Sequence, residues 1–205
     1  SEGEAGMIPS VRRSAGGCIL PLLLVLPIAG CGGDGGDPVL DGLAAVLAPE
    51  ERLLQMRLLD PDSPGAVAVV VREPHGGQEL RIYDREGDGP FRARHRSRQG
   101  DRLMNLELED LTGDGREEIL ATWSGGRLEI LEVVARRPDG SYVTIFENGG
   151  REIKRGYARD GGREIRVTSR TYEEEQGQPQ VYEITIYRYD GERFVPAPRN
   201  PRTGS

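Results

Sequence analysis

Hydrophobic and polar residues alternate along most of the chain beyond residue 65. Residues 67–71 form a continuous apolar run, Val-Ala-Val-Val-Val, which is typical of a buried strand. Three later segments, around Leu106, Ile165 and Ile184, have an apolar residue at every second position. A period of two predicts half-buried antiparallel strands. The pattern therefore predicts an all-β fold, and in the last segment it places Ile184 and Ile186 together on the apolar face.

One segment before residue 65 has helical character instead. Leu53, Leu54 and Leu58 form a narrow apolar stripe at helical spacing, while Pro49 suits a first turn. Pro61 would end such a helix. The sequence therefore predicts one short N-terminal helix, covering residues 43–59 and packing against an edge of the sheet.

Asp-Gly turns recur at a fixed spacing along the chain. Asp88, Asp139 and Asp190 each precede a glycine and are separated by 51 residues, twice over. Asp-Gly favours hairpin turns because the central positions need positive φ. A period of about 50 residues, with about four strands in each unit, is typical of a propeller blade. We therefore expect about three antiparallel propeller-like blades, near residues 66–116, 117–162 and 163–197.

Residues 110–118, Asp-Leu-Thr-Gly-Asp-Gly-Arg-Glu-Glu, are a candidate metal-binding loop. Ca²⁺ prefers six to eight oxygen ligands, several of them anionic. Asp110, Thr112 and Asp114 occupy positions one, three and five, Arg116 can offer its backbone carbonyl from position seven, and Glu118 follows at position nine. An EF-hand is excluded because its bidentate glutamate stands at position twelve and its loop joins two helices. The alternative is a tight turn without metal, since Asp and Gly form turns by themselves.

The same loop resembles the FG-GAP/VCBS repeat of integrin-α type, whose pattern is D-x-[DN]-G-D-G-x-x-[DE] followed by a strand. Thr112 departs from this pattern, and a weaker copy at Asp160–Glu164 has Gly156 and Ala158 where the first two ligands would stand. The resemblance implies β-propeller blades in an extracellular or periplasmic protein. It also implies a structural Ca²⁺ held by Asp110, Asp114 and Glu118.

The first 31 residues predict export and lipidation. Residues 1–6 precede Met7, two arginines follow, and residues 18–29 form an apolar run that is too short to span a membrane. This pattern is typical of a secretory signal peptide. Ile28-Ala29-Gly30-Cys31 resembles the lipobox of bacterial lipoproteins, which implies cleavage before Cys31 and lipidation of that cysteine. The alternative is an ordinary secretory signal in which the cysteine occurs by chance.

The domain organisation follows from these segments. We expect the upstream residues and signal peptide at 1–30, a Gly/Asp-rich tether at 31–42, the helix and β-repeat domain at 43–199, and a disordered tail at 200–205. The N-terminal lipid would anchor the protein in the membrane of a bacterial cell envelope. In the enteric-type lipoproteins that this segment resembles, an aspartate after the cysteine retains the protein in the inner membrane. Gly32 stands at that position, so the resemblance implies the outer membrane or cell surface.

Composition narrows the possible functions. The formal net charge of −7 disfavours nucleic acid as a partner, and two histidines and two cysteines leave little material for zinc binding or His/Cys catalysis. We therefore expect a monomeric, non-catalytic module for binding or scaffolding, with an envelope protein or a glycan as its ligand. Two alternatives remain: an accessory subunit of an envelope assembly, whose blade edges a partner strand completes, and a carboxylate-dependent hydrolase.

Overall fold

The computed structural model describes residues 37–60, 65–72, 77–97, 102–171 and 181–198. Within these ranges the chain forms one helix, α1 (Pro38–Ala44), and twelve strands. The strands are β1 (Arg52–Leu58), β2 (Ala66–Arg72), β3 (Gln78–Asp84), β4 (Arg92–Arg96), β5 (Arg102–Glu109), β6 (Glu118–Gly125), β7 (Leu128–Arg136), β8 (Tyr142–Gly150), β9 (Glu152–Tyr157), β10 (Arg163–Arg170), β11 (Tyr182–Tyr189) and β12 (Phe194–Pro196). The prediction of a mainly antiparallel β fold with a short N-terminal helix is confirmed.

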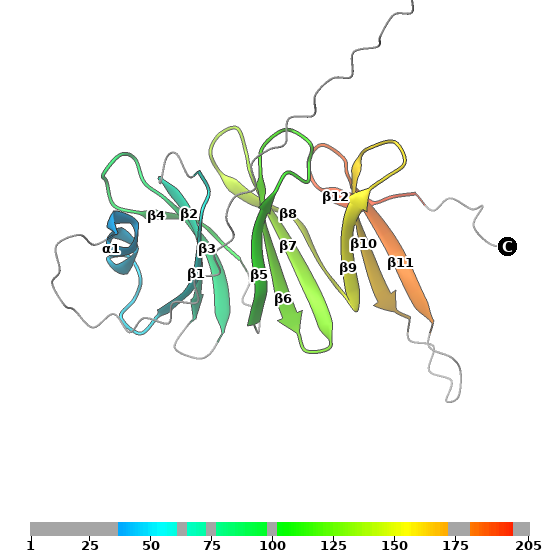
Figure 1. Ribbon diagram of the computed structural model, residues 1–205, viewed down its shortest axis with the longest axis horizontal. Coiled ribbons are helices and arrows are strands. Elements are labelled where there is room, and N and C mark those ends of the chain that lie inside the picture. The colour runs from blue at the N-terminus through cyan, green and yellow to red at the C-terminus, as the bar shows by residue number, and fades with distance from the viewer. Residues whose placement is uncertain (1–36, 61–64, 73–76, 98–101, 172–180, 199–205) are drawn as a thin grey trace, which may run out of the picture.

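The strands form three four-stranded sheets, each made of four consecutive strands in chain order: sheet A (β1–β4), sheet B (β5–β8) and sheet C (β9–β12). The three sheets stand in a row, with α1 beside sheet A and sheet C at the far end (Figure 1). In each sheet the turn between the third and fourth strands lies along the same long side of the row, the upper side in Figure 1. The turns between the first and second strands of sheets B and C lie on this side as well, as do the described residues of the β1–β2 turn. This side is called the turn end below, because the strands end there.

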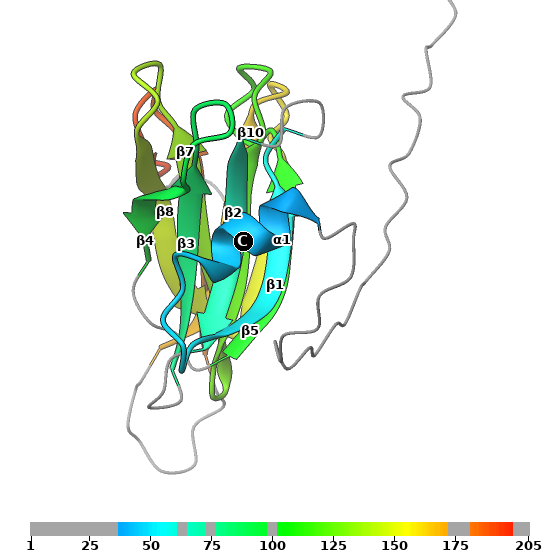
Figure 2. The ribbon, with the colours of Figure 1, turned by 90° about the vertical axis from the view of Figure 1, so that its left-hand side faces the viewer.

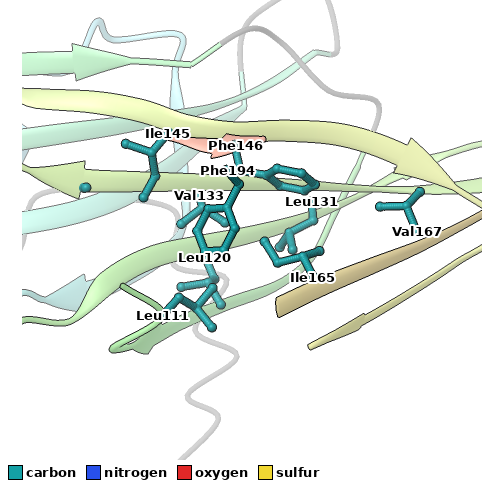
Figure 3. Close-up of a cluster of buried hydrophobic side chains, with 10 residues drawn as sticks. Leu111, Leu120, Leu131, Val133, Ile145, Phe146, Ile165, Val167 and Phe194 are labelled. Atoms are coloured by element: carbon teal, nitrogen blue, oxygen red, sulfur yellow. The ribbon is translucent and has the colours of Figure 1, made fainter. Parts of the chain in front are cut away.

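Apolar side chains fill both spaces between the sheets. Between sheets A and B, one cluster includes Val70, Ile82 and Trp123. Between sheets B and C, the cluster in Figure 3 joins Leu120, Leu131 and Val133 of sheet B to Ile165, Val167 and Phe194 of sheet C. On the outer face of sheet A, Val39 and Leu43 of α1 pack against Val67, Val69, Val71, Tyr83 and Phe91. Figure 2 looks along the row from this side, with α1 in front.

The helix lies earlier in the chain than the sequence predicted. Asp37 caps α1 by accepting a hydrogen bond from the Val39 backbone N–H (2.8 Å), and Pro38 occupies the first turn, where its missing N–H costs nothing. α1 therefore takes up part of the segment expected as a tether. Gly42 lets the helix approach the sheet closely, since a Cβ there would stand 2.9 Å from the Phe91 ring.

The predicted helix over 43–59 is wrong, because most of its second half is strand β1. The pairing of β1 with β2 passes from Leu53 to Gln55 and leaves Leu54 as a bulge. The bulge turns Leu53, Met56 and Leu58 toward α1 and Leu54 toward sheet B, and this arrangement imitates helical spacing. Because β1 is the first strand of sheet A, the three repeat units begin at β1, β5 and β9, one strand before the predicted starts at residues 66, 117 and 163.

Bulges recur at matching places in sheets A and B. Leu54 in β1 and Met104 in β5 are both skipped by the strand pairing and lie 50 residues apart. Arg94 in β4 and Ile145 in β8 are skipped in the same way and lie 51 residues apart. The predicted period of about 50 residues is confirmed for these two sheets. The pairings of sheet C show no such irregularity among the described residues.

The last predicted strand presents the opposite face to the core. Tyr187 of β11 packs into the cluster between sheets B and C, so Ile184 and Ile186 point outward, and Ile184 is 62% exposed. The alternation is present as predicted, but the aromatic side chains and not the isoleucines fill the core. In the described part of the chain, the structure contains no helix with the length and apolarity needed to cross a bilayer.

Candidate functional site

The acidic loop Asp110–Glu118 connects β5 to β6 at the turn end of sheet B. Gly113 and Gly115 both have positive φ, +80° and +85°, which L-residues adopt only under strain. The two glycines fold the loop back so that the side chains of Asp110 and Asp114 meet backbone N–H groups of the loop itself. The structure therefore places the loop where the sequence predicted it, as a tight connection between two strands.

The two aspartates of the loop accept hydrogen bonds from its backbone. The Asp110 carboxylate accepts from Gly113 N–H (2.6 Å) and Gly115 N–H (3.1 Å). Asp114 accepts from Arg116 N–H (2.9 Å). Each carboxylate oxygen keeps a further lone pair for another partner. Asp114 is exposed and Asp110 is half-buried. Carboxylate oxygens of this kind are the hard ligands that Ca²⁺ prefers.

Glu118 is buried beneath the loop and is only 3% exposed. Its carboxylate accepts hydrogen bonds from the backbone N–H of Leu111 (2.7 Å) and Thr112 (3.1 Å), and from the Thr112 hydroxyl (3.1 Å). Burial raises the pKa of Glu118 above its ordinary value, these hydrogen bonds oppose that rise, and the charge of Asp114 adds to it. Glu118 thus fixes the first half of the loop from inside.

The structure brings the five predicted metal-site residues into one loop without gathering their acidic groups. Asp114 is exposed and Asp110 is half-buried, whereas the Thr112 hydroxyl donates a hydrogen bond to the buried Glu118. Among the described residues, no three His, Cys, Asp or Glu side chains are close enough together to hold a metal ion. Calcium binding by this loop stays a prediction.

The corresponding turn of sheet C, between β9 and β10, also has a buried glutamate, but different groups bind its carboxylate. Glu164 is as deeply buried as Glu118, at 2% exposure, but it lies on the outer face of the sheet. It accepts a hydrogen bond from Arg166 Nε (2.6 Å) and lies 3.8 Å from Arg188 Nη2. Asp160 in the same turn pairs with Arg188 (3.0 Å). Here two arginines replace the backbone N–H groups that Glu118 uses.

Three turns of sheets B and C meet around Tyr189. Burial, and then the negative charges of Glu118, Asp114 and Asp190, raise the pKa of Tyr189. Arg137 of the β7–β8 turn lies 3.8 Å from Glu192 of the β11–β12 turn. The turns of sheets B and C therefore lie next to one another at the turn end.

A buried polar cluster between sheets A and B has no counterpart in the sequence analysis. Glu132 of β7 accepts hydrogen bonds from Trp123 Nε1 and Thr144 Oγ1, each at 3.3 Å. His95 Nε2 of β4 lies 3.8 Å from the same carboxylate and makes no hydrogen bond to any described residue. The sequence does carry a signal, because His95 stands between Arg94 and Arg96 in a strand whose arginines are exposed. The cluster is a polar contact between sheets A and B.

Cys31, the predicted lipidation site, and the predicted signal peptide lie outside the described residues, as does the predicted tail at 200–205. No protein-family model matches the chain, and no curated protein matches it.

Proposed function

We propose that this chain is a bacterial envelope lipoprotein, anchored through Cys31, whose β domain is a non-catalytic module for binding or scaffolding. Its three sheets would be propeller-like blades of FG-GAP/VCBS type, arranged as an open stack. The blade assignment is supported by the strand order, since each sheet is a meander of four consecutive strands, as in a propeller blade.

The observation that carries the proposal is the gathering of the turns along one side of the row, the turn end (Figure 1). The described acidic side chains of these turns are Asp60, Glu86, Asp88, Asp110, Asp114, Glu117, Asp139, Asp160, Asp190 and Glu192. Several hold their own turns by accepting backbone hydrogen bonds, as Asp139 does from Ser141 (2.9 Å) and Asp190 from Arg193 (2.9 Å). A rigid, acidic loop surface on a stable β scaffold is suited to display and recognition.

Calcium would stabilise this surface at the β5–β6 turn. Asp110 and Asp114 would supply anionic oxygens, the backbone carbonyl of Arg116 a neutral one, and Thr112 and Glu118 the side chains beneath them. With about three carboxylates the affinity falls in the range of extracellular modules, about 10⁻³ M. Ca²⁺ at about 10 mM would then stabilise the fold by about 1.4 kcal/mol.

Thermal unfolding tests the calcium part of the proposal. We expect about 10 mM Ca²⁺ to raise the Tm by about 3–6 °C, and Asp114→Ala to abolish this rise. Asp139→Ala is the matched control, because it removes an exposed aspartate from the neighbouring turn of the same sheet. An unchanged Tm in the unsubstituted protein would rule out the calcium site.

Lipid anchoring is tested separately, so that the calcium site and the lipid anchor can each be refuted without the other. In a bacterial host we expect the chain to incorporate labelled fatty acid and to partition into detergent, and we expect Cys31→Ser to lose both properties. Incorporation of label into the Cys31→Ser variant would contradict lipidation at this residue.

A further inference from the structure

The link between the predicted lipid anchor and the folded domain is shorter than the sequence suggested. The predicted tether covers residues 31–42, but Asp37 already caps α1, which packs on sheet A. Six residue steps therefore separate Cys31 from Asp37. A fully extended chain spans at most about 3.6 Å per residue, so this link is at most about 22 Å long. The α1 end of the row consequently stays close to any lipid that Cys31 carries.

The packing of α1 on the outer face of sheet A keeps the link short. Val39 and Leu43 are buried, and both pack against the valines of β2 and the Phe91 ring. Arg85 Nη1 also donates a hydrogen bond to the Pro38 carbonyl, at 3.4 Å. The link could gain length only if α1 unwound, which is unfavourable because it would expose these apolar side chains to water.

Sheet C lies at the opposite end of the row from α1 (Figure 1). Packed sheets lie about 10 Å apart, so sheet C is about 20 Å beyond sheet A and farther still from α1. Its outer face carries ion pairs, such as Lys154 with Glu152 (2.9 Å) and Arg188 with Asp160 (3.0 Å). A charged outer face is typical of the last unit in a stack, which ends in water.

The surface of α1 is not suited to enter a bilayer. Asp37 and Asp41 are exposed, and Leu40 is the exposed large apolar side chain of this helix, at 37%. Helices that insert into the membrane interface have a broad apolar face flanked by Lys and Arg. Because α1 buries its apolar face against sheet A instead, a lipid on Cys31 would hold the domain beside the membrane and not in it.

We propose that α1 and the outer face of sheet A form the membrane-facing end of the anchored protein, and that sheet C is presented farthest from the lipid. This inference rests on the proposed lipid anchor and adds the orientation of the domain to it. The turns of sheet C, with Asp160 and Asp190, are then the part of the turn end that extends farthest from the membrane.

Site-specific labelling measures this orientation. Signal cleavage removes Cys18 and the Cys31 sulfur carries the lipid, so the mature chain has no other cysteine. Leu40→Cys on α1, Met104→Cys on sheet B and Ile184→Cys on sheet C each introduce one thiol at an exposed position. A short-range fluorescence donor is attached to the thiol, and acceptor lipids are placed in both leaflets of a vesicle. We expect energy transfer to fall in this order, by about twofold or more overall, because the sheet spacing sets the added distance.

A longer link provides the matched control. Twelve Gly/Ser residues inserted after Gly32 raise the longest possible span from about 22 Å to about 65 Å and leave Cys31 in place. Energy transfer from the Leu40→Cys label should then fall, and its difference from the Ile184→Cys label should shrink. Circular dichroism and the unfolding midpoint check that each variant is folded.

The possible failures are distinguishable. The inference is overturned if a chain that carries labelled fatty acid and floats with the vesicles shows equal transfer from the Leu40→Cys and Ile184→Cys labels, or if the longer link changes nothing. A chain that incorporates no fatty acid would instead refute the proposed anchor, and the inference would fall with it.

Discussion

The two ends of the stack treat their outer sheet faces in opposite ways. At one end α1 covers sheet A, and Val67, Val69 and Val71 of β2 are completely buried. At the other end the outer face of sheet C has no described cover, and Ile184 stands largely in solvent. Both faces belong to antiparallel meanders built in the same way. The comparison teaches that alternation defines the two faces of a strand, while the next layer decides which face is buried.

The buried charged residue also has the opposite sign on these two faces. On sheet A, Arg81 is buried at 2% exposure and is held by two hydrogen bonds to Glu51 (3.0 and 2.6 Å) and by contact with Glu79. On sheet C, Glu164 is buried between Arg166 and Arg188. In each case two partners of opposite sign satisfy one buried charge, as burial of a charge requires.

The largest loss of stability is expected when the packing of α1 on sheet A is weakened. Leu43 of α1 is fully buried against the sheet, so Leu43→Ala should lower the free energy of unfolding by about 2–4 kcal/mol. Leu40 lies on the same helix but is exposed, and Leu40→Ala should cost less than about 0.5 kcal/mol. Urea-induced unfolding measures both. Equal effects would mean that α1 does not pack on sheet A.

The second-largest effect is expected for the ion pair between Glu51 and Arg81 of sheet A. Glu51→Gln removes the negative charge that faces Arg81, while Glu79 remains as a partner. Because the pair is mostly withdrawn from water, we expect a loss of about 1–3 kcal/mol in the same measurement. Glu50→Gln, in the adjacent exposed position, serves as the control and should have almost no effect.

The Glu51–Arg81 pair makes the free energy of unfolding depend on pH. The hydrogen bonds from Arg81 lower the pKa of Glu51 in the folded protein, although burial opposes this. A lowered folded-state pKa adds stability at pH values above the ordinary glutamate value, about 4.3, and loses it as the pH falls through the folded-state pKa. The stability difference between the unsubstituted protein and Glu51→Gln should therefore be constant near neutrality and shrink below about pH 4. A difference that grows on acidification would contradict this.

The smallest change in stability is expected on the outer face of sheet C, which no described residue covers. Ile184→Thr changes a mostly solvated side chain and should alter the free energy of unfolding by less than about 0.5 kcal/mol. Val69→Thr places a hydroxyl on the covered face of sheet A and should cost about 1–3 kcal/mol. A large effect at Ile184 would show that another layer covers sheet C in solution.

Sequence patterns located the strands β2, β5, β10 and β11 and the acidic loop, for reasons that are local. The alternation around Ile165, the 51-residue spacing of Asp88 and Asp139, and the positive-φ glycines of residues 110–118 all depend on neighbouring residues. The burial of Glu118 could not be predicted, because it depends on how the loop folds over its own carboxylate.

By itself the sequence determined the β class, the period of about 50 residues, and the positions of the Asp-Gly turns and of the acidic loop, since these features follow from backbone preferences and side-chain periodicity. The positive φ expected at the central positions of the Asp-Gly turns occurs only at Gly140 and Gly191, and at none of the three aspartates. The tertiary structure decided that residues 52–58 are a strand, that Ile184 points away from the core, and that His95 meets Glu132. The physical reason is that a short apolar segment satisfies more than one local pattern, and only the layer packed against it selects the strand and the face that are buried.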